Sequence, residues 1–380
     1  MIYLDNAATT KLNDEVKKTI TKLYDTYYMN ADSPYLPAVK INNLQEEARI
    51  KIAELLNVKD NELIFTSCGS EANNMAIKGI AFKYLNKGKY HIITSIIEHS
   101  SVYESMKQLE QLGFEVTYLK PNKYGEISNE DILNNIKDNT ILISVMKINS
   151  EIGSINKVED IYQDIKLKNN NIIVHIDYVQ AFGKYDLNLT NCDLGSFSAH
   201  KINGVKGSAL LYKKSNVTLL PLISGGQQEF HLRAGTSNYF YNIALVKTLR
   251  LFIEKRRELE KNNFIKERFN YLVKLLQSDS CIHINSNIEK NSCYVINFSI
   301  PNYKPEVILN ALEAKEIYIS TKSACSTNVK RSRVIDSLPI SDDLKDSAFR
   351  VSLSLDTTID EIDIFYQELI KILDNVVVNG

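Results

Sequence analysis

Ser196-Phe197-Ser198-Ala199-His200-Lys201 is the stretch of sequence from which the fold is most readily predicted. Its pattern is typical of a short strand that ends in Ser, His and Lys, and the glycines that follow, Gly204 and Gly207, predict a turn. A lysine amine at such a strand end could condense with an aldehyde cofactor, while Ser198 and His200 hold the phosphate of that cofactor. A surface lysine in a turn is the alternative, and it is the preferred interpretation of these six residues alone.

The composition of the whole chain sets limits on its class. Its 380 residues are 44% hydrophobic and 24% charged, which is typical of a globular protein with two domains. The net charge of −1 gives no global electrostatic reason to expect binding to nucleic acid or to an anionic membrane. There is no apolar run long enough to span a bilayer, no signal-peptide pattern, and no Cys-x-x-Cys pair among the five cysteines. We therefore expect a cytoplasmic protein without a disulfide framework or a metal site.

Short runs rich in Ile and Val alternate with helical periodicities through the first two thirds of the chain. The runs cover residues 63–66, 91–95, 114–119, 141–145, 172–177, 194–198 and 209–212. Apolar strands separated by helices are typical of a mostly parallel sheet that is buried on both faces. We therefore predict an α/β fold with a seven-stranded sheet and helices on both faces. Two helices are expected before the sheet, in residues 12–57, with Pro34 and Pro37 breaking helical structure between them.

A second, smaller α/β unit is expected after the long helical stretch that starts at Asn242. Strand-like runs and helical patterns alternate again in residues 295–299, 306–315, 318–320, 348–353 and 359–373. We predict a large domain of residues 12–255 and a small domain formed by residues 1–11 and 256–380.

Polar residues follow the ends of several predicted strands, which is where ligands bind in parallel sheets. Gly69 and Ser70 stand at a helix start and suit a phosphate group, although Ser70 is equally well explained as a helix N-cap. Asp177 could pair with a pyridinium nitrogen and Gln180 with a ring oxygen. An Asp that caps the next turn is about as common.

His99 and Asn149 also follow predicted strands. His99 could lie on a cofactor ring and transfer protons, although a lone histidine is more often structural. Asn149 could contact an oxygen of a substrate or cofactor, or belong to a plain polar turn. Because all these residues fall on successive strand ends, one shared explanation is better than several separate ones. That explanation is pyridoxal 5′-phosphate (PLP) bound to Lys201.

The order of these motifs resembles that in the cysteine desulfurases of the NifS/IscS-like group, within the class V aminotransferase family. The resemblance covers nearly the whole chain. The motifs that carry it include Tyr3-Leu4-Asp5-Asn6-Ala7-Ala8-Thr9-Thr10, Phe65-Thr66-Ser67 through Glu71, Glu98-His99, Asn149-Ser150-Glu151-Ile152-Gly153, His175-Ile176-Asp177 with Gln180, Ser196 to Lys201, Gln228-Glu229 with Arg233-Ala234-Gly235-Thr236, Ser323-Ala324-Cys325-Ser326 and Arg350. The resemblance implies the type I fold of PLP-dependent transferases and a homodimer.

The resemblance also implies a role for each candidate residue. Lys201 would bind the cofactor aldehyde, and the cofactor ring would be contacted by His99, Asn149, Asp177 and Gln180. The cofactor phosphate would be held by Gly69, Ser70, Ser198, His200 and, across the subunit interface, Thr236. The substrate carboxylate would be bound by Asn149 and Arg350, with Asn30 on the substrate side of the pocket.

Cys325 is implied to be the nucleophile that receives sulfur. Small polar residues surround it, and Lys330, Arg331 and Arg333 follow, so we expect an exposed loop over about residues 323–336 with cations that favour the thiolate. The implied reaction converts L-cysteine to L-alanine. The persulfide formed on Cys325 would pass its sulfur to an acceptor protein, such as an iron–sulfur scaffold or a tRNA-thiolation carrier.

Four segments depart from the usual sequence of the family, at residues 29–36, 178–179, 227–231 and 354–355. Two alternatives therefore stay open. One is a different class V PLP lyase or aminotransferase, acting on selenocysteine or cysteine sulfinate. The other is a weakly active PLP-binding homologue that serves as an interaction or regulatory subunit.

Overall fold

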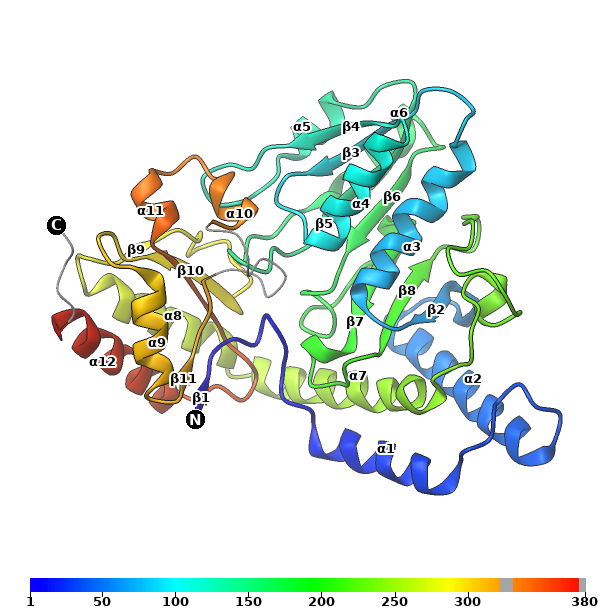
Figure 1. Ribbon diagram of the computed structural model, residues 1–380, viewed down its shortest axis with the longest axis horizontal. Coiled ribbons are helices and arrows are strands. Elements are labelled where there is room, and N and C mark those ends of the chain that lie inside the picture. Colours follow the sequence, from blue (N-terminus) through cyan, green and yellow to red (C-terminus); the bar gives the residue numbers. More distant parts are fainter. Residues whose placement is uncertain (322–330, 376–380) are drawn as a thin grey trace.

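A seven-stranded sheet forms the centre of the computed structural model, which describes residues 1–321 and 331–375 (Figure 1). In order across the sheet, its strands are β2 (Leu63–Thr66), β8 (Ala209–Lys213), β7 (Leu194–Ser198), β6 (Ile173–Asp177), β5 (Thr140–Met146), β3 (His91–Ser95) and β4 (Glu115–Leu119). β8 runs antiparallel to both of its neighbours, and the other pairings are parallel. The predicted mostly parallel seven-stranded sheet is therefore confirmed.

Helices cover both faces of this sheet because its strands carry apolar side chains in both directions. In β3, for example, Ile92 packs on one face and the next residue, Ile93, on the other. The face of Ile92 is covered by α3 (Gly69–Ala81) and α4 (Ser100–Gln111). The face of Ile93 is covered by α2 (Leu36–Leu56), α6 (Tyr162–Lys168) and α7 (Tyr239–Glu260).

Two helices precede the sheet, as predicted, but the second begins earlier than expected. α1 (Asp14–Thr26) starts after Asn13, whose side-chain oxygen accepts hydrogen bonds from two N–H groups of the first turn. α2 begins at Leu36, so Pro37 lies inside its first turn. The prediction that Pro37 breaks helical structure is wrong, because the first N–H groups of a helix have no partner within it.

A second group of elements packs beside the sheet and joins both ends of the chain (Figure 1). β12 (Ala348–Ser352), β10 (Val295–Ser299) and β9 (His283–Ile284) form an antiparallel sheet, and β1 (Ile2–Tyr3) pairs with β11 (Ile317–Tyr318). Their apolar side chains share a cluster with α8 (Phe264–Gln277), α9 (Pro305–Glu313) and α12 (Ile359–Asn375). This cluster agrees with a small domain, and the division near residue 255 stays a prediction.

Three short helices lie in connections: α5 (Asn129–Asn134), α10 (Arg333–Asp336) and α11 (Asp342–Asp346). α10 falls within the loop expected over residues 323–336, so that expectation is wrong for residues 333–336. Ser332 stabilises the helix start, because its Oγ accepts a hydrogen bond from the Ile335 N–H at 3.1 Å. Residues 322–330, with Cys325, lie outside the described residues. None of the helices in the described ranges is long and apolar enough to cross a membrane.

Candidate active site

A cavity of about 220 Å³ lies where β5, β6 and β7 end, in front of the start of α3. Its walls also include the N-terminal segment and β12, so residues from both ends of the chain meet there. Most of the predicted site residues line it: Gly69, Ser70, His99, Asp177, Gln180, Ser198, His200, Lys201 and Arg350. The sheet edge predicted from the strand ends is therefore the place where these side chains come together.

The amine of Lys201 lies against the N-terminal segment. Lys201 ends a short 3-10 turn that follows β7. Its Nζ donates hydrogen bonds to the carbonyls of Ala7 and Ala8, at 2.6 and 2.7 Å. The neighbouring His200 carbonyl accepts from both the N–H and the Oγ1 of Thr10, each at 2.9 Å. The N-terminal segment thus fixes the amine at the cavity wall.

The start of α3 and the end of β7 form a wall that suits an anion. Gly69 is buried there, and a Cβ on it would lie 2.8 Å from Val179 Cγ2 and 3.6 Å from Ser198 Cβ, so only glycine lets these segments approach without a shift. Ser198 is 1% exposed, and its Oγ has no hydrogen-bond partner among the described residues. A buried hydroxyl in this position, next to the first N–H groups of a helix, suits a phosphate.

His200 stands beside this wall as a neutral ring. Its Nδ1 lies 3.1 Å from Thr9 Oγ1. Burial, followed by the positive charge of Lys201, lowers the pKa of His200 to about 4. At neutral pH the ring therefore has one N–H donor and no net charge, so it would bind an anion by hydrogen bonding.

A line of hydrogen bonds joins Asp177 to His99. One carboxylate oxygen of Asp177 accepts from the Val179 N–H at 2.9 Å, and the other accepts from Asn73 Nδ2 at 2.8 Å. Asn73 Nδ2 also donates to Ser101 Oγ at 2.9 Å, and this Oγ lies 2.8 Å from His99 Nδ1. Burial lowers the pKa of His99 although the charge of Asp177 opposes this, so the ring is neutral at neutral pH.

Sequence reasoning missed Asn73 and Ser101. Asn73 is 1% exposed on α3, where it lies among buried apolar residues of the same helix. It follows Ser70 by three positions, which places both on one side of the helix. A polar residue at this spacing on an otherwise apolar helical face is the signal that could have identified it.

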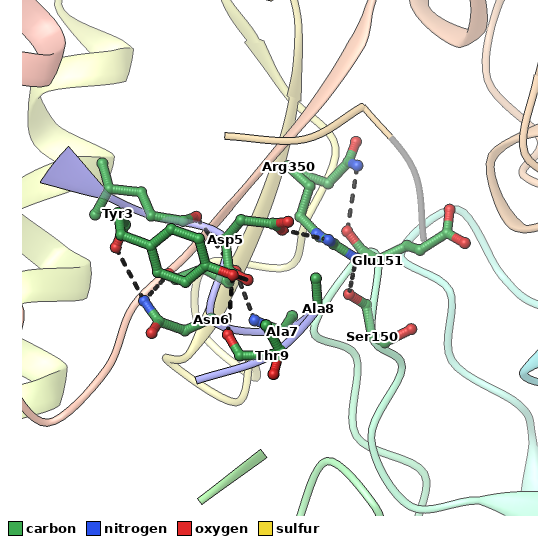
Figure 2. A network of polar contacts seen from close by, with 12 residues as sticks. Tyr3, Asp5, Asn6, Ala7, Ala8, Thr9, Ser150, Glu151 and Arg350 are labelled. Carbon is green, nitrogen blue, oxygen red and sulfur yellow. Dashed lines mark hydrogen bonds and ion pairs between the residues drawn. The ribbon is translucent and has the colours of Figure 1, made fainter. Parts of the chain in front are cut away.

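Arg350 reaches the cavity from β12 and is held by the N-terminal segment (Figure 2). Its Nη2 forms an ion pair with Asp5 Oδ1, and its Nη1 donates to the Ser150 carbonyl at 3.1 Å. The side chain is 1% exposed, and its Nε has no hydrogen-bond partner among the described residues. Asp5 belongs to a motif noted in the sequence, but its contact with Arg350 was not predicted.

Of the predicted site residues that the structure describes, three do not line this cavity. Asn149 is buried beside it, where its Nδ2 donates to the Ile97 carbonyl at 3.0 Å and its Oδ1 accepts from two N–H groups of the following turn. Asn30 lies in the connection between α1 and α2. Thr236 lines a separate cavity of about 150 Å³ together with Arg233. Their contacts with cofactor or substrate stay predictions.

Cys325 lies outside the described residues, but the chain on both sides of it is held near the cavity. Before it, Ser320 and Arg350 exchange backbone hydrogen bonds at 3.1 and 2.6 Å. After it, Arg333 Nη2 donates to the carbonyl of Glu98 at 2.7 Å, one residue from His99. Described residues on either side of Cys325 along the chain therefore contact residues at or next to the site.

Two of the cations expected to favour the Cys325 thiolate have other partners. Arg331 forms ion pairs with Asp346 at 2.6 Å and Asp342 at 2.8 Å. The Arg333 guanidinium also lies 3.8 Å from the centre of the Tyr103 ring. These contacts were not visible in the sequence, since the acidic and aromatic partners are distant along the chain.

The fold and the site are those of an α/β enzyme in which successive strand ends and the N-terminal segment surround one lysine. The chain belongs to the class V aminotransferase family: the family described as "Aminotransferase class-V" matches residues 2–365. The family predicted from the motifs is therefore confirmed.

Known proteins similar to this chain agree with the assignment. A "NifS/IcsS protein homolog" of Lactobacillus delbrueckii subsp. bulgaricus is 37% identical over 371 residues, which cover 96% of this chain and 95% of the relative. A "Cysteine desulfurase IscS" of Buchnera aphidicola subsp. Baizongia pistaciae is 39% identical over 380 residues, which cover 95% of this chain and 90% of the relative.

Two solved structures are similar over almost the full length. One, described as "NIFS-LIKE PROTEIN", has a TM-score of 0.92 at 33% identity, covering 99% of this chain and 100% of that one. Another, described as "SspA in complex with cysteine", has a TM-score of 0.79 at 30% identity, covering 93% of this chain and 99% of that one. The predicted fold is confirmed by these likenesses.

The lowered pKa of His200 leads to a prediction about stability. An unfolded histidine takes up a proton near pH 6.5, but folded His200 does so only near pH 4, so protons favour the unfolded state in this window. The stability of the cofactor-free protein should therefore fall from pH 6.5 to pH 4. In His200→Asn this fall should be smaller, as measured by urea unfolding at a series of pH values. Parallel curves for the two proteins would contradict the prediction.

Proposed function

We propose that the protein is a PLP-dependent cysteine desulfurase, which converts L-cysteine to L-alanine and transfers the sulfur to Cys325. The observation that carries the proposal is the cavity in which the Lys201 amine lies together with the Asp177 carboxylate and the unpartnered Ser198 hydroxyl. Relatives named cysteine desulfurase, and a similar structure described as a complex with cysteine, support the same activity and substrate.

The cavity residues fit PLP at three separate points. Lys201 offers an amine for the cofactor aldehyde. Asp177, oriented by Asn73 and by a backbone N–H, offers a buried carboxylate for the ring nitrogen. The wall formed by the start of α3, Ser198 and neutral His200 offers hydrogen-bond donors for the phosphate. An apolar ligand in this cavity would leave the buried Ser198 hydroxyl without a hydrogen-bond partner among the described residues.

When bound, PLP supplies an electron sink that stabilises negative charge on the α-carbon of an amino acid. Residues of the chain would then bind the substrate and transfer its protons. Arg350 would bind the substrate carboxylate, because its planar guanidinium suits two parallel hydrogen bonds. Lys201 Nζ would take the α-proton, and His99, neutral at neutral pH, would exchange a proton with the substrate sulfur.

Cys325 would receive the sulfur as a nucleophile. Its thiolate attacks the sulfur of the substrate, a sulfur–sulfur bond forms, and the carbon–sulfur bond of the substrate breaks. The electron pair of that bond stays with the three-carbon fragment, which takes up protons and leaves as L-alanine. The contacts of Ser320 with Arg350 and of Arg333 with the Glu98 carbonyl support this role, because Cys325 lies between Ser320 and Arg333 in the sequence.

We also propose a homodimer in the cytoplasm that delivers sulfur to an acceptor such as an iron–sulfur scaffold or a tRNA-thiolation carrier. Support for a dimer comes from large apolar side chains exposed around α1 and α2, among them Tyr28 at 86% and Leu36 at 67% exposure. Thr236 lies away from the cavity of its own chain, as a contact with a partner's cofactor requires. The described cysteines are all free, as in a reducing compartment: Cys68, Cys192, Cys281 and Cys293.

Replacement of Cys325 tests the proposed function. With L-cysteine and a thiol reductant, the PLP-loaded enzyme should release equal amounts of alanine and sulfide. Cys325→Ser should lower this rate by about 1000-fold or more, because no other residue supplies the nucleophile. It should keep the cofactor absorbance. Cys281→Ser is the matched control and should keep the wild-type rate.

Two results of this experiment would contradict the proposal. Wild-type rates in Cys325→Ser would remove Cys325 from the mechanism. Full activity of Cys325→Ser on selenocysteine or cysteine sulfinate, with no wild-type activity on L-cysteine, would favour the alternative lyase.

Arg350→Lys tests the proposed substrate contact. A lysine cannot bind Asp5, the Ser150 carbonyl and a carboxylate with the same planar fork. The KM for L-cysteine should rise roughly 10- to 100-fold, as expected for loss of a charged hydrogen bond, while PLP binding stays unchanged. Arg257→Lys, on an exposed side chain outside the cavity, is the control. An unchanged KM in Arg350→Lys would show that the carboxylate binds elsewhere.

A further inference from the structure

Lys184 is a buried lysine behind the cavity that the proposed mechanism does not use. It is 6% exposed, and its Nζ lies 5.1 Å from the centre of the Tyr294 ring. Within the described ranges, no carboxylate lies at ion-pair distance from this Nζ. Burial, followed by the positive charge of Lys201, lowers the pKa of Lys184 to about 7. A lysine in such a place lowers the stability of the fold, so packing alone does not explain it.

The Lys184 side chain is hydrogen-bonded to Gln180. Lys184 Nζ donates to Gln180 Oε1 at 3.1 Å. Both the charged and the neutral amine can donate, so this bond holds the amide oxygen toward Lys184 in either state. The amide of Gln180 consequently has one orientation, with its Nε2 on the side away from Lys184.

The nitrogen end of the Gln180 amide contacts a residue of the candidate active site. Gln180 lines the cavity, and its Nε2 donates to the Ala7 carbonyl at 3.0 Å. The same carbonyl accepts from Lys201 Nζ at 2.6 Å. A continuous line of hydrogen bonds therefore runs from Lys184 through Gln180 and Ala7 to the amine that is proposed to hold the cofactor.

We propose that Lys184 is a positioning residue that orients the Gln180 amide, so that its Nε2 donor faces the Ala7 carbonyl and the cofactor. The inference rests on the proposed function, because it concerns how the cavity receives PLP. Lys184 itself does not line the cavity, and its hydrogen bond toward the site is the one to Gln180. A Gln180 amide without this bond could rotate by half a turn and present its oxygen to the cavity, where it would face an acceptor.

A double-mutant cycle tests this inference. Lys184→Met keeps the length of the side chain but removes the donor, and Gln180→Leu removes the amide. The readouts are the dissociation constant for PLP, measured by absorbance titration of the cofactor-free protein, and the melting temperature of the cofactor-free protein. Lys184→Gln keeps an N–H donor without the charge, and Lys78→Met, on a partly buried lysine at the far end of α3, is the control.

Lys184→Met should weaken PLP binding roughly three- to tenfold, as expected for loss of one hydrogen bond, and should alter the absorbance spectrum of the bound cofactor. The melting temperature should stay the same or rise, because a buried cation is removed. The double variant should bind PLP no more weakly than Gln180→Leu, because Lys184 acts through that residue. Lys184→Gln should bind PLP more tightly than Lys184→Met, and Lys78→Met should bind PLP as tightly as the wild type.

The inference would be overturned if the losses of PLP affinity caused by Lys184→Met and by Gln180→Leu added together in the double variant. A lowered melting temperature with unchanged PLP binding would also overturn it, since that combination identifies a structural residue. Failure of the proposed function is distinct from both: a wild-type protein that binds no PLP would overturn the function together with this inference.

Discussion

The hydrogen bonds from Lys201 to the carbonyls of Ala7 and Ala8 are the contacts on which the rest of the site depends. The same N-terminal segment also binds Arg350 through Asp5 (Figure 2). The proposed cofactor lysine follows the large sheet, whereas the proposed substrate arginine lies in β12 of the second sheet. The segment of residues 5–8 therefore contacts both the amine of Lys201 and the guanidinium of Arg350. Figure 1 shows it passing between the two groups of elements.

Charge is the second constraint on the site. Lys201 and Arg350 bring positive charge to a largely buried region, and Asp5 and Asp177 are two of the carboxylates that lie in it. The two histidines of the cavity have lowered pKa values because they are buried, with Lys201 as a further cause at each. Both neutral rings therefore supply N–H donors to the cavity without adding positive charge. This balance suits a ligand with several negative charges, such as a cofactor phosphate together with a substrate carboxylate.

The order of strands and helices could be predicted because parallel strands are apolar on both faces, and their carboxyl ends meet at one edge. Residues at those ends or shortly after them, such as Asp177 and Lys201, were predicted to be in the site for this reason. Asn73 was not, because its partner Asp177 is distant along the chain. Lys184 was missed although Gln180 is close to it in the sequence, because the burial of its side chain is a property of the folded chain. The first turn of α2 was missed because proline breaks a helix only beyond that turn.

The attachment of the cofactor to Lys201 is the central claim, and it can be measured directly. PLP-loaded protein is treated with sodium borohydride, which reduces a lysine–cofactor double bond to a stable single bond, and the digested peptides are analysed by mass spectrometry. The modification should lie on Lys201, in the peptide that follows β7. Stoichiometric modification of another lysine, such as Lys184, or no modification of any peptide, would contradict the claim.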